Sequence, residues 1–220
     1  MTERSFNGKT VLLTAGPTHE PIDPVRFIGN HSTGKMGYAL AECFAEQGAK
    51  VVLVSGPTNL HTHHANIQVK HVTTANEMYK AVQKYADAAD IWVFAAAVAD
   101  YRPKTVADKK IKKAGDELTI ELVKNVDIAA ALGKQKEEWQ FSVGFALETD
   151  NESANAREKL RKKNLDMIVL NSLKDPGAGF AHDTNKITII EEDATHTFEL
   201  KKKSEVAEDI VNLISKRIHG

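Results

Sequence analysis

The sequence is poor in cysteine, in aromatic residues and in long apolar runs. Of its 220 residues one is Cys, and 6% are Phe, Trp or Tyr. A single Cys excludes a disulfide framework and a Cys-rich zinc module, and it is typical of a reducing compartment, so we expect a cytoplasmic protein. The first residues, MTERSFNGKT, lack the apolar stretch of a signal peptide, and no apolar run approaches the roughly 18 residues that cross a bilayer. We therefore expect no membrane partner.

An excess of one charge is also missing. The 29 Lys and Arg residues balance 30 Asp and Glu residues, which gives a formal net charge of −1. A dedicated nucleic-acid binder usually carries a basic excess that releases counterions on binding, so we expect no nucleic-acid partner. The basic residues are nevertheless grouped, at 109–113 and at 157–163. The balanced net charge argues against a long polyanion as ligand, but the local basic groups are compatible with a nucleotide.

Short apolar runs alternate with helical patterns along the first half of the chain. The runs are continuous, as in strands that are buried on both faces of a parallel sheet. They comprise residues 9–15, 50–55 and 91–97. Segments 34–47 and 74–85 between them repeat apolar residues at helical spacing, and this β-α-β order predicts an α/β fold with a Rossmann-like, doubly wound, mostly parallel sheet and helices on both faces.

The second half is less regular. Segments 186–190 and 196–200 predict a small C-terminal β-hairpin. Residues 101–115 are polar and Lys-rich without an apolar period, which predicts a mobile loop. Because no Pro-, Gly- or Ser-rich linker divides the chain, we expect one domain over residues 1–220.

Two glycine motifs are incomplete. Residues 29–35 fit G-x-x-x-x-G-K, but Met36 stands where a magnesium-binding hydroxyl is needed, and the motif begins well after the first strand ends. The first strand is also not followed by G-x-G-x-x-G, so a nicotinamide site has little support. The start of a helix near Ser32 and Gly34 still favours an anion, although an ordinary helix cap explains it as well.

Other candidate positions each have a plain structural alternative. Residues 95–97 and Asp100 follow a buried strand, where ligands of such sheets bind, but close helix packing explains the small residues equally well. The histidines of the HTHH sequence at 61–64 lack converging partners, so exposure in a loop is favoured over a metal site. Cys43 lies on the apolar face of its helix and is expected in the core.

Seven segments taken together resemble one known family. They are TAGPT (14–18), EPIDPVRFIGNHSTGKMG (20–37), AAAVADYRP (95–103), KIKK (110–113), LVKNVDI (122–128), VGFALET (143–149) and KLRKKNLD (159–166). In this order they resemble phosphopantothenoylcysteine synthetase (phosphopantothenate–cysteine ligase) of the bacterial, CTP-dependent type. The same module is found fused to phosphopantothenoylcysteine decarboxylase, and this chain lacks that half, so either a stand-alone enzyme or one half of a bifunctional chain remains open.

The resemblance implies a homodimeric ligase of coenzyme A biosynthesis. The carboxylate of 4′-phosphopantothenate would attack the α-phosphate of CTP to give an acyl cytidylate and pyrophosphate. The amine of L-cysteine would then release CMP and form 4′-phosphopantothenoylcysteine. CTP is implied as co-substrate and Mg²⁺ as its metal, with Asp100 as the expected contact to a metal held mainly by the nucleotide phosphates.

The resemblance also implies residue roles. Asn30 and Lys110 are the expected catalytic residues, Asn30 at the substrate carboxylate and acyl phosphate and Lys110 on the loop over the nucleotide. Arg26 and Ala97 join Asn30 as expected substrate-binding residues, and Arg26 lies on a dimer-forming segment. The expected nucleotide-binding residues hold the phosphates, the sugar or the base: Gly16, Ser32, Gly34, Gly37, Asp100, Val126, Asp127, Ile128, Ala129, Phe145, Lys159 and Lys163.

Two positions depart from the family pattern. Val126 stands where proline is usual, which loosens one turn, and Thr33 replaces a serine while keeping a hydroxyl. Two hypotheses from other classes also remain. One is a nicotinamide- or flavin-binding oxidoreductase, which fits the fold class alone. The other is a non-catalytic nucleotide-binding or scaffolding subunit.

Overall fold

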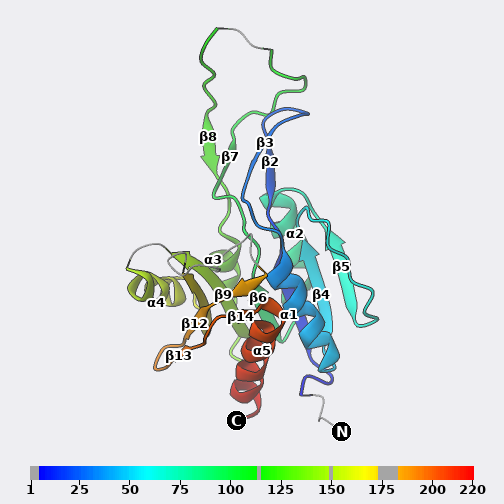
Figure 1. Cartoon of the computed structure of the whole chain (residues 1–220). Helices are drawn as coiled ribbons and strands as arrows, with labels where there is room; N and C mark the ends of the chain where they lie inside the picture. Colours follow the sequence, from blue (N-terminus) through cyan, green and yellow to red (C-terminus); the bar gives the residue numbers. More distant parts are fainter. Residues whose placement is uncertain (1–4, 113–114, 149–150, 173–182) are drawn as a thin grey trace.

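An eight-stranded sheet forms the centre of the protein (Figure 1). The computed structural model describes residues 5–112, 115–148, 151–172 and 183–220. The strand order is β13-β12-β10-β9-β6-β1-β4-β5. These strands span Thr195–Thr197 (β13), Ile187–Ile190 (β12), Met167–Ser172 (β10), Phe141–Glu148 (β9), Ile91–Phe94 (β6), Thr10–Ala15 (β1), Lys50–Ser55 (β4) and Ile67–His71 (β5).

The six strands from β10 to β5 pair parallel with one another. Helices cover both faces of this sheet, and they are α1 (Lys35–Glu46), α2 (Ala75–Ala86), α3 (Ile128–Gly133), α4 (Glu152–Lys162) and α5 (Lys203–His219). Adjacent residues of β1 show why the strand is continuously apolar: Leu13 is buried among residues of α1 and α5, while Leu12 is buried among residues of α2 and α3. The expected doubly wound α/β fold is confirmed.

The expected C-terminal hairpin is also present. Strands β12 and β13 pair antiparallel, and β12 pairs antiparallel with β10, so the hairpin extends one edge of the main sheet. A further pair, β11 (Thr184–Asn185) and β14 (Lys201–Lys202), leads into α5. The two-stranded pair therefore places the first residue of α5 beside the end of β10.

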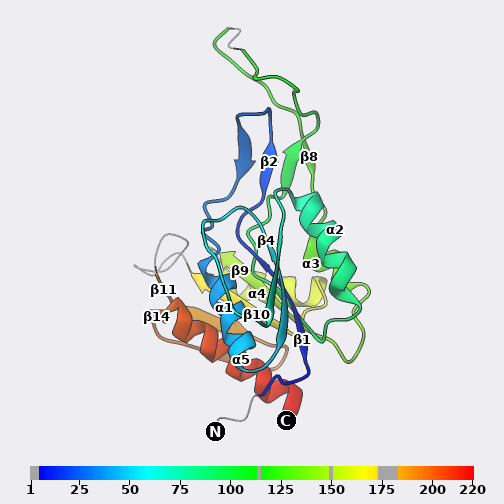
Figure 2. The same cartoon turned by 90° about the vertical axis from the view of Figure 1, so that its right-hand side faces the viewer.

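Two hairpins project from the body of the protein above the carboxyl ends of the parallel strands (Figures 1 and 2). One pairs β2 (His19–Pro21) with β3 (Phe27–Gly29), and the other pairs β7 (Tyr101–Pro103) with β8 (Leu122–Lys124). We call residues 19–29 and 101–124 together the arm. No helix in the described ranges is long and apolar enough to cross a membrane.

The arm includes the segment 101–115 that was expected to be a loop over the nucleotide. Its first residues form β7, and the following stretch bonds to the turn of the other hairpin. The Ala107 N–H donates to the Ile22 carbonyl at 3.0 Å. The Ile111 N–H donates to Asp23 Oδ2 at 3.1 Å. Backbone pairing thus holds this segment against the β2–β3 turn, while Lys113 lies outside the described residues.

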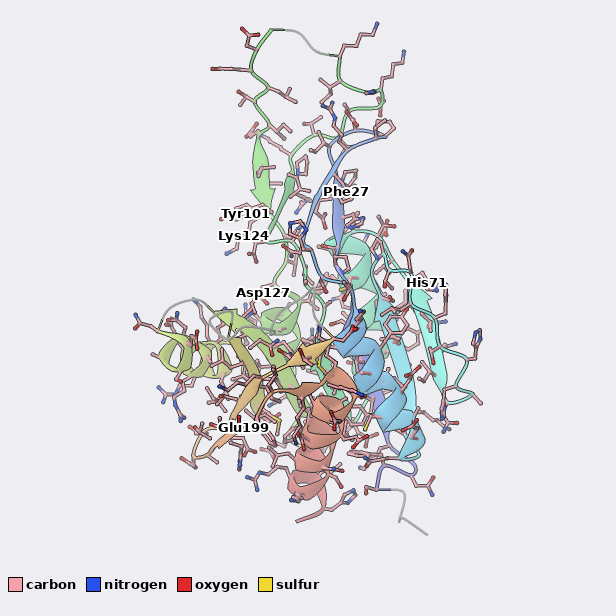
Figure 3. The ribbon with its side chains drawn as sticks, in the orientation of Figure 1. Phe27, His71, Tyr101, Lys124, Asp127 and Glu199 are labelled. Carbon is pink, nitrogen blue, oxygen red and sulfur yellow. The ribbon has the colours of Figure 1, made fainter. Side chains whose placement is uncertain are left out.

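Large apolar side chains are exposed along the arm. Phe27 and Tyr101, labelled in Figure 3, are 54% and 51% exposed. The others on the arm are Val25, Val106, Leu118 and Leu122. An apolar surface of this kind on a projecting element is typical of an interaction site.

Candidate active site

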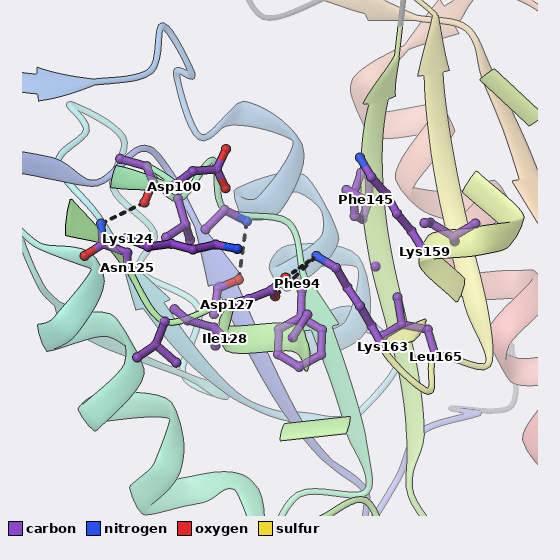
Figure 4. Close-up of a pocket in the computed structure, with 18 residues that line it drawn as sticks. Phe94, Asp100, Lys124, Asn125, Asp127, Ile128, Phe145, Lys159, Lys163 and Leu165 are labelled. Carbon is purple, nitrogen blue, oxygen red and sulfur yellow. Dashed lines mark hydrogen bonds and ion pairs between the residues drawn. The ribbon is translucent and has the colours of Figure 1, made fainter. Parts of the chain in front are cut away.

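Two cavities open where the parallel strands β6 and β9 end. We call the first the α3–α4 cavity, because the start of α3 and one face of α4 line it (Figure 4). It has a volume of about 240 Å³. The second, the α1 cavity, has a volume of about 360 Å³ and is lined by the start of α1. Both volumes lie near the lower end of the range for small-molecule sites.

A common wall separates the cavities. Ala96, Val98, Asp100 and Phe145 line both of them. Residues 96–100 follow β6, and Phe145 lies on β9, which is the neighbouring strand. Ligands of open α/β sheets bind outside these carboxyl ends, so this is the position where a site is expected.

The α3–α4 cavity brings together eight of the residues expected to bind nucleotide. They are Asp100, Val126, Asp127, Ile128, Ala129, Phe145, Lys159 and Lys163. Two lysines of α4 and its C-terminal end therefore face the turn that begins α3. The cavity combines this positive charge with apolar side chains, as a site for a charged ring compound requires.

Asp127 holds the turn at the start of α3. Its carboxylate accepts from the Ala130 N–H at 3.1 Å, and it is the N-cap residue of the helix. Lys163 Nζ lies 3.0 Å from Asp127 Oδ2, across the cavity. Burial alone would raise the pKa of Asp127, but the hydrogen bonds from Ala130 and Lys163 outweigh it and lower the pKa. The carboxylate is therefore charged at neutral pH and orients Lys163.

Asn125 is a positioning residue that the sequence analysis did not single out. Its Nδ2 donates to the Ala99 carbonyl at 2.8 Å, and its N–H donates to the Asp100 carbonyl. Arg102 Nη1 donates to Asn125 Oδ1 at 3.0 Å. These bonds tie the end of β8 to the segment after β6. A signal was available, since Asn125 directly precedes the turn that the resemblance assigned to CTP.

The α1 cavity contains a different part of the expected site. Asn30, Ser32, Gly34, Gly37 and Ala97 line it. Asn30 Nδ2 donates to the Ala97 carbonyl at 3.0 Å, which joins the segment before α1 to the shared wall. The resemblance placed the hydroxyl and the two glycines with the nucleotide. The structure places them in the α1 cavity, beside Asn30 and Ala97, which the resemblance implies bind the substrate.

Backbone geometry explains the two glycines at the start of α1. Gly34 has φ +80°, a left-handed conformation that favours glycine. A Cβ on Gly37 would lie 2.5 Å from Ala15 Cβ, so a side chain there would push α1 away from β1. Gly37 thus lets α1 pack closely on the end of β1, and the first helical turn, Lys35 to Gly37, lines the α1 cavity.

Three expected site residues line neither of these two cavities. Gly16 packs behind the start of α1, where a Cβ on Gly34 would lie 3.3 Å from Gly16 Cα. Arg26 belongs to the arm, where its Nη2 donates to Asp23 Oδ2 at 2.6 Å and to the Ile111 carbonyl. These hydrogen bonds hold the pKa of Asp23 well below its usual range. Lys110 lies on the same part of the arm, next to Ile111.

The donor set for a metal is sparse. Within the described ranges, no three His, Cys, Asp or Glu side chains gather closely enough to hold an ion, and this includes the HTHH loop. Asp100 lies on the shared wall and offers one carboxylate. One carboxylate with phosphate oxygens is a common way to hold Mg²⁺, so the residues present fit a metal that arrives with a nucleotide.

Comparison with known proteins identifies the family and the fold. The sequence model for the DNA/pantothenate metabolism flavoprotein C-terminal domain matches residues 6–218. The chain belongs to this family. The crystal structure of the C-terminal domain of the coenzyme A biosynthesis bifunctional protein CoaBC superimposes on this chain with a TM-score of 0.83 at 40% identity, covering 98% of both chains.

Longer relatives carry the family domain as one part. The coenzyme A biosynthesis bifunctional protein CoaBC of Vibrio cholerae is 47% identical over 213 residues, which are 96% of this chain and 53% of that protein. A protein named cysteine/cysteine sulfinic acid decarboxylase, from an unknown prokaryotic organism, is 54% identical over 220 residues, which are 100% of this chain and 61% of that protein. The chain thus spans about half to three fifths of the length of these relatives, and the resemblance to the synthetase module is confirmed.

Proposed function

We propose that the chain is a phosphopantothenate–cysteine ligase that uses CTP. The single observation that carries the proposal is the pair of cavities with a common wall at Asp100 and Phe145. One cavity has the lysines for a nucleotide, and the other has Asn30 and the start of α1 for an acid. Reaction between two bound substrates requires this adjacency, because positioning supplies much of the rate. The CoaBC relatives, named for coenzyme A biosynthesis, support the same assignment.

In the first step a substrate carboxylate oxygen attacks the α-phosphorus of CTP. The bond to the bridging oxygen breaks, and pyrophosphate leaves with the electron pair. In the second step the cysteine amine attacks the acyl carbon, loses a proton, and CMP leaves. Asn30 lies at the shared wall, where its amide can donate to the oxygens that gain negative charge.

Lysines and Mg²⁺ would neutralise the phosphates. Lys159 and Lys163 line the α3–α4 cavity, and Asp100 offers a carboxylate at its edge. The metal ion would supply charge neutralisation for the leaving pyrophosphate. The chain's own residues orient the nucleotide through Asp127, which fixes both the α3 turn and Lys163.

The arm supports a homodimer. Its exposed apolar side chains, including Phe27 and Tyr101, would be covered by the same surface of a second copy. Assembly through the arm also gives a role to Arg26 and Lys110, which line neither of the two cavities of their own chain. We therefore propose that these residues act in the dimer.

A decarboxylase is the proposed partner, either as a fused domain or as a separate chain. The bifunctional relatives are about twice as long as this chain, which supports the first arrangement. A cytoplasmic location is consistent with the single cysteine and remains part of the proposal.

Pyrophosphate release tests the function directly. The protein is incubated with CTP and Mg²⁺, with and without 4′-phosphopantothenate, and then with L-cysteine. Release should require phosphopantothenate, and amide formation should require cysteine. Equal release without phosphopantothenate would refute the assignment. Tight NADPH binding in the absence of CTP binding would revive the oxidoreductase hypothesis, which the CoaBC relatives do not favour.

A further inference from the structure

The turn of the β2–β3 hairpin contains a buried carboxylate that the sequence analysis did not single out. Asp23 lies on the projecting arm, yet its side chain is fully buried. Its Oδ1 accepts hydrogen bonds from the N–H groups of Val25 and Arg26, each at 2.9 Å, as is common for an aspartate in a turn. The turn therefore uses only one of the two carboxylate oxygens.

The second oxygen reaches the other hairpin of the arm. Asp23 Oδ2 accepts from the Ile111 N–H at 3.1 Å, across 88 positions of sequence. It also accepts from Arg26 Nε at 3.1 Å and from Arg26 Nη2 at 2.6 Å. Arg26 Nη2 donates to the Ile111 carbonyl as well, at 3.2 Å, so both backbone polar groups of Ile111 are held. We call these contacts between Asp23, Arg26 and Ile111 the Asp23 junction.

Lys110 directly precedes the residue that the junction holds. It is exposed and lines neither of the two cavities of its own chain. The junction fixes the backbone on one side of it, and the bond from the Ala107 N–H to the Ile22 carbonyl fixes the other side. A segment that is already ordered loses less conformational entropy when it acts on a ligand than a free loop does. The expected catalytic residue Lys110 is therefore carried by an anchored segment.

The junction explains why an aspartate stands at this position. The two turn N–H groups would be satisfied equally well by the side-chain oxygen of Asn or Ser. The donors at Oδ2, one of which is a guanidinium, require a second, charged acceptor. The hydrogen bonds from Arg26, with those from the Val25 and Ile111 N–H groups, hold the pKa of Asp23 well below its usual range, so the carboxylate is charged at neutral pH.

We propose that Asp23 is a positioning residue of the ligase reaction, because it fastens the segment that carries Lys110 to the β2–β3 turn and so holds Lys110 at a fixed place on the arm. This inference rests on the proposed function, in which Lys110 acts on the nucleotide within the dimer. The role of Asp23 is indirect, since its side chain is buried in the arm and lines neither of the two cavities.

Asp23→Asn breaks the junction with almost no change of side-chain shape. The amide oxygen should stay with the turn, because the Val25 and Arg26 N–H groups are two and three residues away, whereas the Ile111 bond closes a long loop. The segment around Lys110 should then open more often. Trypsin cleavage of the Lys110–Ile111 bond, followed by mass spectrometry, should be about tenfold to a hundredfold faster, since a charged acceptor is lost.

Glu121→Gln is the matched control for this cleavage experiment. Lys104 Nζ and Glu121 Oε1 lie 2.7 Å apart on the same arm, and their side chains are 56% and 68% exposed. The substitution exchanges a carboxylate for an amide but leaves the Asp23 junction intact, so cleavage at Lys110 and turnover should both be unchanged. Equal acceleration of cleavage in the two variants, or no acceleration in Asp23→Asn, would overturn the inference.

Turnover tests whether the junction serves the reaction. At saturating substrates, kcat for pyrophosphate release should fall roughly tenfold or more in Asp23→Asn, because a small misplacement of a catalytic group is costly. In a Lys110→Met background, Asp23→Asn should lower kcat no further, since the residue that it positions is gone. A second, independent loss of kcat in the double variant would overturn the positioning role. A fall in kcat that accompanies dissociation to monomers in sedimentation equilibrium would do the same.

A measurement on the wild-type protein decides the junction even if Asp23→Asn does not fold. The Ile111 amide should exchange its hydrogen at least about tenfold more slowly than the same amide in an unstructured peptide, because Asp23 accepts its hydrogen bond. Absence of this protection would overturn the inference.

The outcomes also separate this inference from the proposed function. If the wild-type protein releases no pyrophosphate, the function fails, while hydrogen exchange and cleavage at Lys110 still decide whether the junction anchors the segment. If Asp23→Asn is cleaved faster but turns over normally, the proposed function stands and only the inference fails.

Discussion

Replacing Lys163 with methionine should separate nucleotide binding from stability. Lys163 and Asp127 pair at 3.0 Å, but their side chains are 26% and 44% exposed. An ion pair with this exposure contributes about 0.2–1 kcal/mol to the free energy of unfolding. In a chain of this size, a change of this magnitude lowers Tm by no more than about 2–4 °C.

The expected effect on CTP is much larger. A phosphate oxygen in the α3–α4 cavity would accept a charge-assisted hydrogen bond from Lys163, which is worth about 1.5–3 kcal/mol. Loss of that bond corresponds to a roughly 10- to 150-fold weaker affinity. The binding effect should therefore exceed the stability effect, because a bound phosphate carries more charge than Asp127 alone.

The assay is calorimetric titration of CTP with Mg²⁺, accompanied by thermal unfolding of each variant. Lys162→Met is the matched control, since Lys162 ends the same helix, carries the same charge and is exposed. Equal losses of CTP affinity in the two variants would show a general electrostatic effect and refute the placement of the nucleotide. A fall in the Tm of Lys163→Met well beyond this range would show that the Lys163–Asp127 ion pair contributes more to the free energy of unfolding than its exposure suggests.

Three further predictions follow from other parts of the protein. Asn30→Asp should slow consumption of the acyl cytidylate in quenched-flow experiments, because a carboxylate repels the developing charge; normal turnover would count against the role of Asn30. Leu118→Ser should shift the protein toward monomer in sedimentation equilibrium, whereas Trp139→Ser, which is 57% exposed but off the arm, should not. The Arg217 guanidinium lowers the pKa of Glu191 from its ordinary 4.5, so the stabilisation by Glu191 is complete above pH 4.5 and is lost as pH falls through the folded value. Glu191→Gln should flatten this acid dependence of Tm, and an unchanged acid limb would contradict the reasoning.

The main sheet could be predicted because each of its central strands is a continuous apolar run in the sequence. Continuous apolar runs such as residues 50–55 fit only strands that are buried on both faces, and the helical segments between them fix the order. The hairpin of β12 and β13 was predicted from segments 186–190 and 196–200. Its place at the edge of the sheet depends on pairing with β10, about 20 residues earlier, and no local pattern encodes such a pairing.

The arm and the division of the site were harder to predict. Within residues 104–112, the N–H groups of Ala107 and Ile111 bond to the β2–β3 turn, and such backbone bonds leave little trace in side-chain patterns. Helix-start chemistry near Ser32 and Gly34 predicted an anion site, and this stays a prediction, since the same chemistry fits an ordinary helix cap and does not say which anion would bind. Asn185 and Lys203, which line the α1 cavity, gave no signal, since an isolated Asn and one of three consecutive lysines look like ordinary surface residues.

The α1 cavity has a consequence for folding. Its walls come from residues within 30–37, 95–100 and 145–147, and from Asn171, Asn185 and Lys203. Early and late parts of the chain must therefore both be in place before the cavity exists, and α1 packing on α5 joins them. A ligand held there is linked to global unfolding rather than to local opening, and at a hundred times its Kd it would add about 2.7 kcal/mol to stability. Hydrogen exchange in β1 and α5 should then slow together, because a ligand bound in the cavity stabilises both ends of the chain in the folded state.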